Sequence, residues 1–231
     1  MPETINTATC STCMFKSLIF QKLEKEELDY MDQFKVEKKY KKGEIVVVEG
    51  AQIKEFLYLK NGLVKLFKTG IDLKDHIISI AKPFDFIGFL SVFSKNQYQY
   101  SITCIEDSVI CFVDMDSLKN VIKDNGKFAL DILSKMSLTL DDILSTRIDL
   151  CSRNLRGRIS LLLLFFANDV YHNDSFKLPL TRKEIAGLIE MTTENVIRIL
   201  SEFRKDGLIH IDGSTIQLTN KKLLEAISTA G

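Results

Sequence analysis

The residues with the most specific chemistry lie near the C-terminus, in two short segments that each begin with a threonine. Thr181 precedes Glu184 by three residues, the spacing of a capping box in which each side chain satisfies a backbone N–H at a helix start. Thr192 can cap a second helix soon afterwards. Two helices so close in sequence must turn sharply, so these segments predict a helix-turn-helix, whose first helix braces the second in the DNA major groove.

The outward face of the second predicted helix carries polar side chains suited to reading bases. Arg198 can donate two hydrogen bonds to guanine and Glu194 can accept one from cytosine, so together they could read a G·C pair. Their i,i+4 spacing also lets them hold each other, although such a pair by itself is more often an ordinary surface ion pair. The predicted DNA-contacting residues are Thr181, Arg182, Thr192, Thr193, Glu194, Asn195, Ile197 and Arg198.

Two alternating apolar runs, residues 208–211 and 215–218, follow the second helix. The residues between them are Asp212, Gly213 and Ser214, a strong hairpin signal. The C-terminal segment, which begins near Arg153, is therefore predicted to be a winged helix-turn-helix.

A heptad-like stripe precedes this segment. Its apolar positions alternate in steps of three and four, interrupted by Arg147, and are Leu133, Met136, Leu140, Ile143 and Leu150. This is the spacing of a coiled-coil seam, which predicts a long helix with a dimer interface. A long helix that packs on its own domain would show the same stripe.

Short β-branched or aromatic runs separated by glycine occupy residues 34–114. The glycines are Gly43, Gly50, Gly62, Gly70 and Gly88. Regular short strands with turn signals indicate a β-barrel or sandwich. The whole chain is therefore predicted to be α+β.

The length of 231 residues favours two domains, and the formal net charge of zero means that a DNA-binding surface must come from local arrangement. The longest apolar run, residues 159–167, is far shorter than the roughly 20 residues of a membrane span, and no signal-peptide core is present. We expect a cytoplasmic protein with no membrane partner.

Seven segments together resemble the cyclic-AMP receptor protein/FNR (Crp/Fnr) family of bacterial transcription regulators. They are residues 180–186, 192–200, 207–209, 42–44, 49–50, 62–64 and 85–88. The resemblance implies four parts: an N-terminal segment (1–20), an effector-sensing β-roll of the cyclic-nucleotide-binding type (21–122), a dimerisation helix (123–152) and a winged helix-turn-helix (153–231).

The resemblance also implies partners. A homodimer would place its recognition helices in successive major grooves, ~34–36 Å apart, of a palindromic site in double-stranded promoter DNA. RNA polymerase would be a further partner. In the family, the Glu and Arg that match Glu194 and Arg198 read a G·C pair in each half-site.

The chain departs from the family pattern at three positions. Glu190 stands where the family often has a left-handed glycine, at a cost of about 1–2 kcal/mol. Phe89 and Gln99 replace the Glu and Arg that hold cyclic AMP, and without a cation near Gln99 a buried phosphodiester would be unpaired. We therefore expect another effector, in a pocket lined by Phe86, Gly88, Phe89, Leu90, Gln99 and Tyr100.

Five cysteines, an odd number without framework spacing, indicate free thiols, metal ligands or redox chemistry. The FNR branch of the family binds an iron–sulfur cluster with three N-terminal cysteines and one in the roll. Here Cys10, Cys13 and Cys111 match, but Ile19 stands at the third N-terminal position, and Cys104 is the remaining candidate ligand. The cofactor stays unknown: a cluster is disfavoured by the missing cysteine, and a thiol redox pair or structural thiols are the alternatives.

A second class of function is a ligand-binding module of the cyclic-nucleotide type that regulates a protein partner. An enzyme is not expected, because the sequence contains no Gly-rich phosphate loop, nucleophile elbow or HExxH motif.

Overall fold

The computed structural model describes residues 2–5, 9–10, 13, 20–71 and 73–230, and most of the predicted N-terminal segment thus lies outside the described residues. The chain divides into two compact units. The first comprises residues 1–68 and 78–141, and the second comprises residues 69–77 and 142–231. The four-part division predicted from the sequence stays a prediction.

The first unit contains two β-sheets. Its five-stranded sheet has the order β1 (Glu3–Ile5), β2 (Lys35–Tyr40), β9 (Ser108–Asp114), β4 (Glu55–Asn61) and β7 (Phe86–Ile87). The other sheet has the order β3 (Ile45–Val47), β8 (Ser101–Cys104), β5 (Val64–Thr69) and β6 (Asp75–Ala81), the last two extending into residues 69–77 of the second unit. The β-rich fold predicted for residues 34–114 is confirmed, and the two sheets form the β-roll that the resemblance implies.

Two apolar cores hold the roll together. One joins the two sheets, with Leu57 and Ile110 from the first and Val64 and Ile102 from the second all buried. The other lies between the five-stranded sheet and helices, which are η1 (Phe20–Lys22), α1 (Lys25–Asp32), α3 (Met115–Asp124) and the start of α4 (Gly126–Ser152). A short helix, α2 (Phe89–Val92), follows β7.

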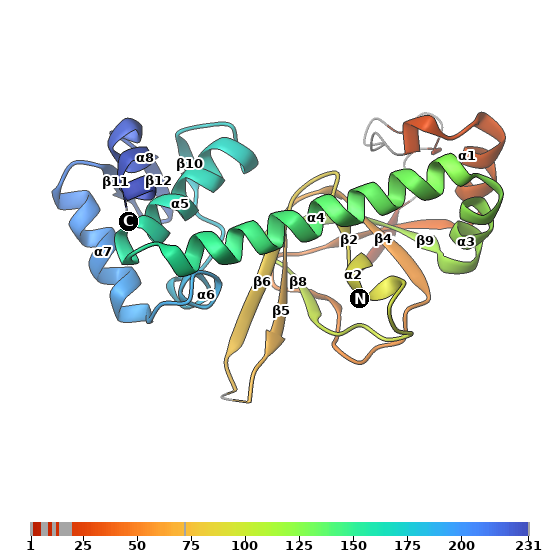
Figure 1. Cartoon of the computed structure of the whole chain (residues 1–231), viewed down its shortest axis with the longest axis horizontal. Coiled ribbons are helices and arrows are strands. Elements are labelled where there is room, and N and C mark those ends of the chain that lie inside the picture. Colours follow the sequence, from red (N-terminus) through yellow and green to blue (C-terminus); the bar gives the residue numbers. More distant parts are fainter. Residues whose placement is uncertain (1, 6–8, 11–12, 14–19, 72, 231) are drawn as a thin grey trace. The chain divides into compact units, whose positions relative to one another are not determined.

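Helix α4 spans 27 residues and is drawn as one continuous helix in Figure 1. The long helix predicted from the heptad-like stripe is thus present, but its predicted seam is divided between two environments. Leu133 and Leu140 are exposed, whereas Met136 packs on the roll core and Leu150 is 3% exposed within its own protomer. Ile143 is half-buried.

The second unit is a helical domain with a small sheet. Its helices are α5 (Leu155–Phe165), η2 (Phe166–Val170), α6 (Arg182–Leu188), α7 (Thr193–Lys205) and α8 (Lys221–Ala230). Its strands pair in the order β10 (Ser175–Lys177), β12 (Thr215–Leu218) and β11 (Ile209–Asp212). Gly213 takes a φ of +57° in the β11–β12 turn, which confirms the predicted hairpin.

Among the described residues, none of the helices combines the length and the apolar character that a membrane crossing requires.

Candidate nucleic-acid interface and sensor region

Helix α6 begins with the predicted capping box. The Thr181 hydroxyl accepts a hydrogen bond from the Glu184 backbone N–H at 3.2 Å, and the Glu184 carboxylate accepts one from the Thr181 N–H at 2.8 Å. Ile185 and Leu188 are buried beneath the helix. Thr181 is exposed and Arg182 is half-buried at its start. The bracing helix is therefore fixed at its N-terminus and along its inner face.

Helix α7 presents one apolar and one polar face. The Thr192 hydroxyl accepts from the Asn195 N–H at 3.3 Å and so caps the helix. The inner face is formed by Val196, Ile199, Leu200 and Phe203, all buried. Of the predicted base-reading residues, Thr192, Glu194, Ile197 and Arg198 are exposed, and Thr193 and Asn195 are half-buried. All six lie on the first two turns of one helix or at its cap.

The turn between α6 and α7 contains Glu190 in the left-handed region, with φ of +54°. This unfavourable conformation is held by two arginines of the same unit. Arg158 donates hydrogen bonds to the carbonyls of Ile189, at 3.2 Å, and Glu190, at 3.0 Å. Arg147 forms an ion pair with the Glu190 carboxylate. The turn thus keeps the geometry that glycine would otherwise supply.

Arg198 does not pair with Glu194, and that expectation was wrong. Its Nη1 donates to the Glu202 carboxylate at 2.6 Å, and its Nη2 to the Asn195 side-chain oxygen at 3.2 Å. Hydrogen bonds from its own backbone N–H and from the Thr192 hydroxyl lower the pKa of Glu194. Glu194 therefore stands ionised at the helix start, where the helix dipole also favours an anion.

The predicted effector pocket is only partly assembled. Phe86 is buried in the helix-side core, Tyr100 in the core between the sheets, and half-buried Leu90 packs against both. Gly88 takes a φ of +80° at the start of α2, and a side chain there would meet the Tyr98 ring at 2.7 Å. The Phe89 side chain lies outside the described residues.

The expectation that no cation lies near Gln99 was also wrong. Lys95 Nζ lies 3.3 Å from the Gln99 side-chain oxygen, and Lys68 Nζ lies 3.4 Å from its backbone carbonyl. Lys68 also pairs with Glu49 at 2.7 Å. Lys68 could not be assigned from sequence, because it comes from β5, whereas Lys95 lies only four residues before Gln99 in the chain. The missing arginine alone therefore does not exclude an anionic effector.

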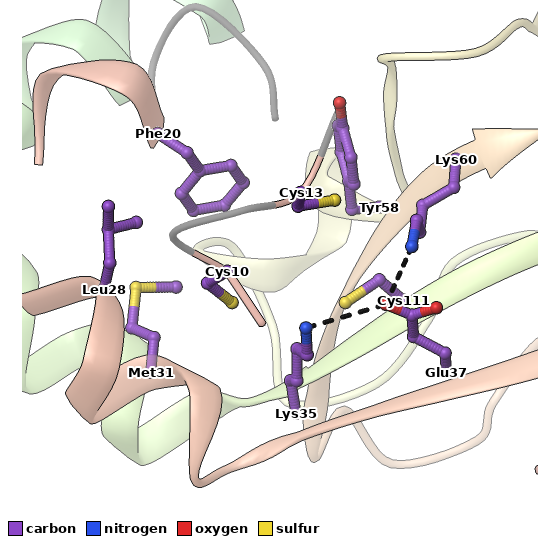
Figure 2. Close-up of a pocket in the computed structure, with 10 residues that line it drawn as sticks. All are labelled: Cys10, Cys13, Phe20, Leu28, Met31, Lys35, Glu37, Tyr58, Lys60 and Cys111. Atoms are coloured by element: carbon purple, nitrogen blue, oxygen red, sulfur yellow. Dashed lines mark hydrogen bonds and ion pairs between the residues drawn. The ribbon is translucent and has the colours of Figure 1, made fainter. Parts of the chain in front are cut away.

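Three of the four candidate metal ligands meet at one cavity. Cys10 and Cys13 from the N-terminal segment and Cys111 from β9 line a cavity of about 40 Å³. Figure 2 shows the three thiols together with the other lining residues. The Cys10 backbone N–H is held by Asp32 at 2.8 Å. Cys104 is elsewhere: it is 1% exposed on β8, in the core between the sheets.

A buried ion cluster forms the other wall of this cavity. The Glu37 carboxylate accepts from Lys60 Nζ at 2.8 Å and lies 3.6 Å from Lys35 Nζ. Lys35 also pairs with Asp32 at 2.9 Å. The side chains of Glu37, Lys35 and Lys60 are 1%, 3% and 5% exposed, so one carboxylate and two ammonium groups are held away from water, and the 26% exposed Asp32 balances the remaining positive charge.

The cavity does not fit the iron–sulfur cluster that the FNR branch uses. Such a cluster needs four protein ligands, and Cys104 is not among the residues that line the cavity. A water requires about 10–15 Å³ by this measure, so 40 Å³ is less than the four irons and four sulfides would need. Within the described part of the chain, no group of three or more His, Cys, Asp or Glu side chains is arranged to hold a metal ion.

Two of the cavity thiols, Cys10 and Cys111, are expected to resist alkylation at neutral pH. Burial, opposed in part by Lys35, raises the pKa of Cys10 to about 12, and burial raises that of Cys111 to about 12 as well. Since the thiolate is the nucleophile, their reaction with iodoacetamide should accelerate about tenfold per pH unit from pH 7 to 9. Peptide mass spectrometry measures this, with exposed Cys151 as the fast-reacting internal reference. A plateau below pH 9 would contradict it and would favour a thiol redox sensor.

Comparisons with known proteins agree with this architecture. The family model for the cyclic nucleotide-binding domain matches residues 37–125, and that for the Crp-like helix-turn-helix domain matches residues 157–227. The anaerobic regulatory protein of Bacillus subtilis is 25% identical over 199 residues, covering 84% of each chain. The fumarate and nitrate reduction regulatory protein of Yersinia pestis is 22% identical over 225 residues, covering 95% of this chain and 90% of the relative.

Among solved structures, FixK2 from Bradyrhizobium japonicum has the same fold, with a TM-score of 0.76 at 21% identity, covering 84% of this chain and 98% of that one. A cyclic-nucleotide-type β-roll followed by a long helix and a helix-turn-helix defines a DNA-binding transcription regulator with a sensor domain. The chain belongs to the Crp/Fnr family of such regulators.

Proposed function

We propose that the chain acts in the cytoplasm as a homodimer that recognises a palindromic promoter site, reading each half-site with the exposed face of α7. The proposal rests on the exposure of the Arg198 side chain. Its side chain is 54% exposed on a helix whose opposite face is buried and whose start is capped. An arginine presented in this way, with Glu194 one turn earlier, has the chemistry that reads a G·C pair.

Dimerisation is supported by an apolar face of α4 that the protomer leaves uncovered. In the first unit, Leu130, Leu133 and Leu140 are 67%, 57% and 45% exposed. In the part of α4 that belongs to the second unit, Leu144 and Ile148 are 60% and 67% exposed. Since large apolar side chains at helical spacing seldom remain in water, we assign the interface to these five residues, which keep Leu133 and Leu140 of the predicted seam and replace its other three members.

The experiment is selection of binding sites by the purified protein from a random DNA pool, followed by titration of the selected site. We expect two inverted half-sites with centres about one helical turn apart. Arg198→Ala should then cost about 1–3 kcal/mol and relax discrimination at one base pair in each half-site.

A matched control separates base reading from loss of charge. Arg204→Ala removes the same charge from the last turn of α7. It should therefore weaken binding to the selected site and binding to scrambled DNA to the same degree. Equal losses on both DNAs for Arg198→Ala would contradict base reading by that residue. A pool that yields no consensus would favour the alternative, a module that regulates a protein partner, and a single half-site would contradict the dimer.

A further inference from the structure

Arg198 is held at two points along its own helix, and one of them is Glu202. The carboxylate of Glu202 lies 2.6 Å from Arg198 Nη1, and Asn195 accepts from Nη2 at 3.2 Å. A guanidinium has five N–H groups, so three remain after these two contacts, and a guanine needs only two of them. The two contacts therefore restrict the orientation of the guanidinium without using up its capacity to read a base.

Glu202 is itself held from a second helix. Its other carboxylate oxygen accepts from Arg156 Nη1 at 3.1 Å. Arg156 comes from α5, lies with its guanidinium carbon 4.8 Å from the centre of the buried Phe203 ring, and pairs with Asp206 at 2.8 Å. The Glu202 carboxylate is thus fixed between two arginines, one anchored on the scaffold and one exposed on the DNA-facing surface.

Helix stability does not account for a glutamate at this position. Glu202 lies toward the C-terminal end of α7, where the helix dipole disfavours an anion. The order Arg198 before Glu202 is also the weaker arrangement for an i,i+4 ion pair. Near DNA, moreover, a carboxylate repels phosphates and lowers affinity for every sequence. What remains are the contacts of Glu202 with two arginines: the one with Arg156 joins α5 to α7, and the one with Arg198 orients an exposed guanidinium.

We propose that Glu202 is a positioning residue that aims Arg198 at the base edge, so that it raises sequence discrimination while lowering general affinity for DNA. This inference rests on the proposed function. An arginine side chain that rotates freely loses more conformational entropy when it binds a base, and it can bind a phosphate instead. An arginine whose guanidinium is already oriented loses less entropy and is pre-organised for one partner.

The test compares the affinity of full-length protein for its selected site with that for a scrambled duplex of the same length. Glu202→Gln should reduce this specificity ratio about threefold to tenfold, because the neutral amide holds the guanidinium less firmly. Affinity for the scrambled duplex should rise, since one negative charge near the phosphates is gone. Glu225→Gln removes the same charge from exposed α8 and should leave the ratio unchanged.

A double-mutant cycle gives the readout that a merely structural role would not produce. In the Arg198→Ala background, Glu202→Gln should no longer lower the ratio, because the side chain that it positions is absent. Two outcomes overturn the positioning role alone. One is that Glu202→Gln lowers the specificity ratio equally in both backgrounds, and the other is that it leaves the ratio of the wild-type background unchanged or raises it. A wild-type ratio near one for every selected sequence overturns the proposed function, and this role with it.

Discussion

Glu37→Gln is expected to lower the free energy of unfolding of the β-roll by about 3–5 kcal/mol, because it removes the carboxylate shared by two buried ammonium groups. Glu37 lies 2.8 Å from Lys60 Nζ and 3.6 Å from Lys35 Nζ, with its side chain 1% exposed. The chain has no tryptophan, so urea unfolding followed by tyrosine fluorescence reports mainly on the roll, which contains five of the six tyrosines, Tyr30, Tyr40, Tyr58, Tyr98 and Tyr100.

Two variants control this measurement. Glu3→Gln removes a carboxylate that is 72% exposed and pairs with Lys39 at 3.9 Å, so it should cost less than about 1 kcal/mol. Replacement of the three buried charges by apolar residues, Lys35→Met with Glu37→Leu and Lys60→Met, should recover most of the loss, because the Asp32 carboxylate that stays charged is 26% exposed and remains in contact with water. A loss for Glu37→Gln no larger than that for Glu3→Gln would show that the cluster is not energetically coupled.

Gly62→Ala should be the other severe change, with a loss of about 2–5 kcal/mol from a strained backbone and a steric clash together. Gly62 takes a φ of +87°, and an added Cβ would meet Ser108 Oγ at 2.3 Å and the Asp107 carbonyl oxygen at 2.4 Å. The same fluorescence-detected unfolding measures it.

Gly43→Ala separates the two causes. Gly43 takes nearly the same φ, +88°, but nothing lies within 4 Å of an added Cβ. This variant should therefore show only the backbone cost, about 1–2 kcal/mol. Equal losses for the two variants would mean that the turn at Gly62 relaxes away from Ser108.

The helix-turn-helix could be predicted almost completely from sequence because its signals are local. The caps at Thr181 and Thr192 and the turn at Gly213 each depend on residues within three positions of one another. The long helix was predicted equally well, but not its partners. A heptad stripe does not say which domain covers it, so Met136 and Leu150 were assigned to a dimer although each packs within its own protomer.

The long-range features of the roll could not be found in this way. Lys35 and Glu37 alternate on a strand in the manner of a solvated face, and only the fold brings Lys60 and the N-terminal helix against them. In sequence Cys111 matches the roll ligand of the FNR branch and Cys104 is the remaining candidate, yet the two belong to different sheets and different cores. Lys68 near Gln99 was missed for the same reason, whereas Lys95, four residues before Gln99, was missed although it is a local neighbour.

The left-handed Glu190 has a mechanical consequence for the second unit. A glycine in that turn would have a wide range of allowed φ and ψ angles, so α7 could change its orientation relative to α6 more easily. A non-glycine residue such as Glu190 has only a small allowed region of φ and ψ on the left-handed side. Its carboxylate also forms an ion pair with Arg147, near the end of α4. The turn between α6 and α7 is therefore stiffer than a glycine turn, and a rotation of the last turns of α4 is expected to move α7 with it.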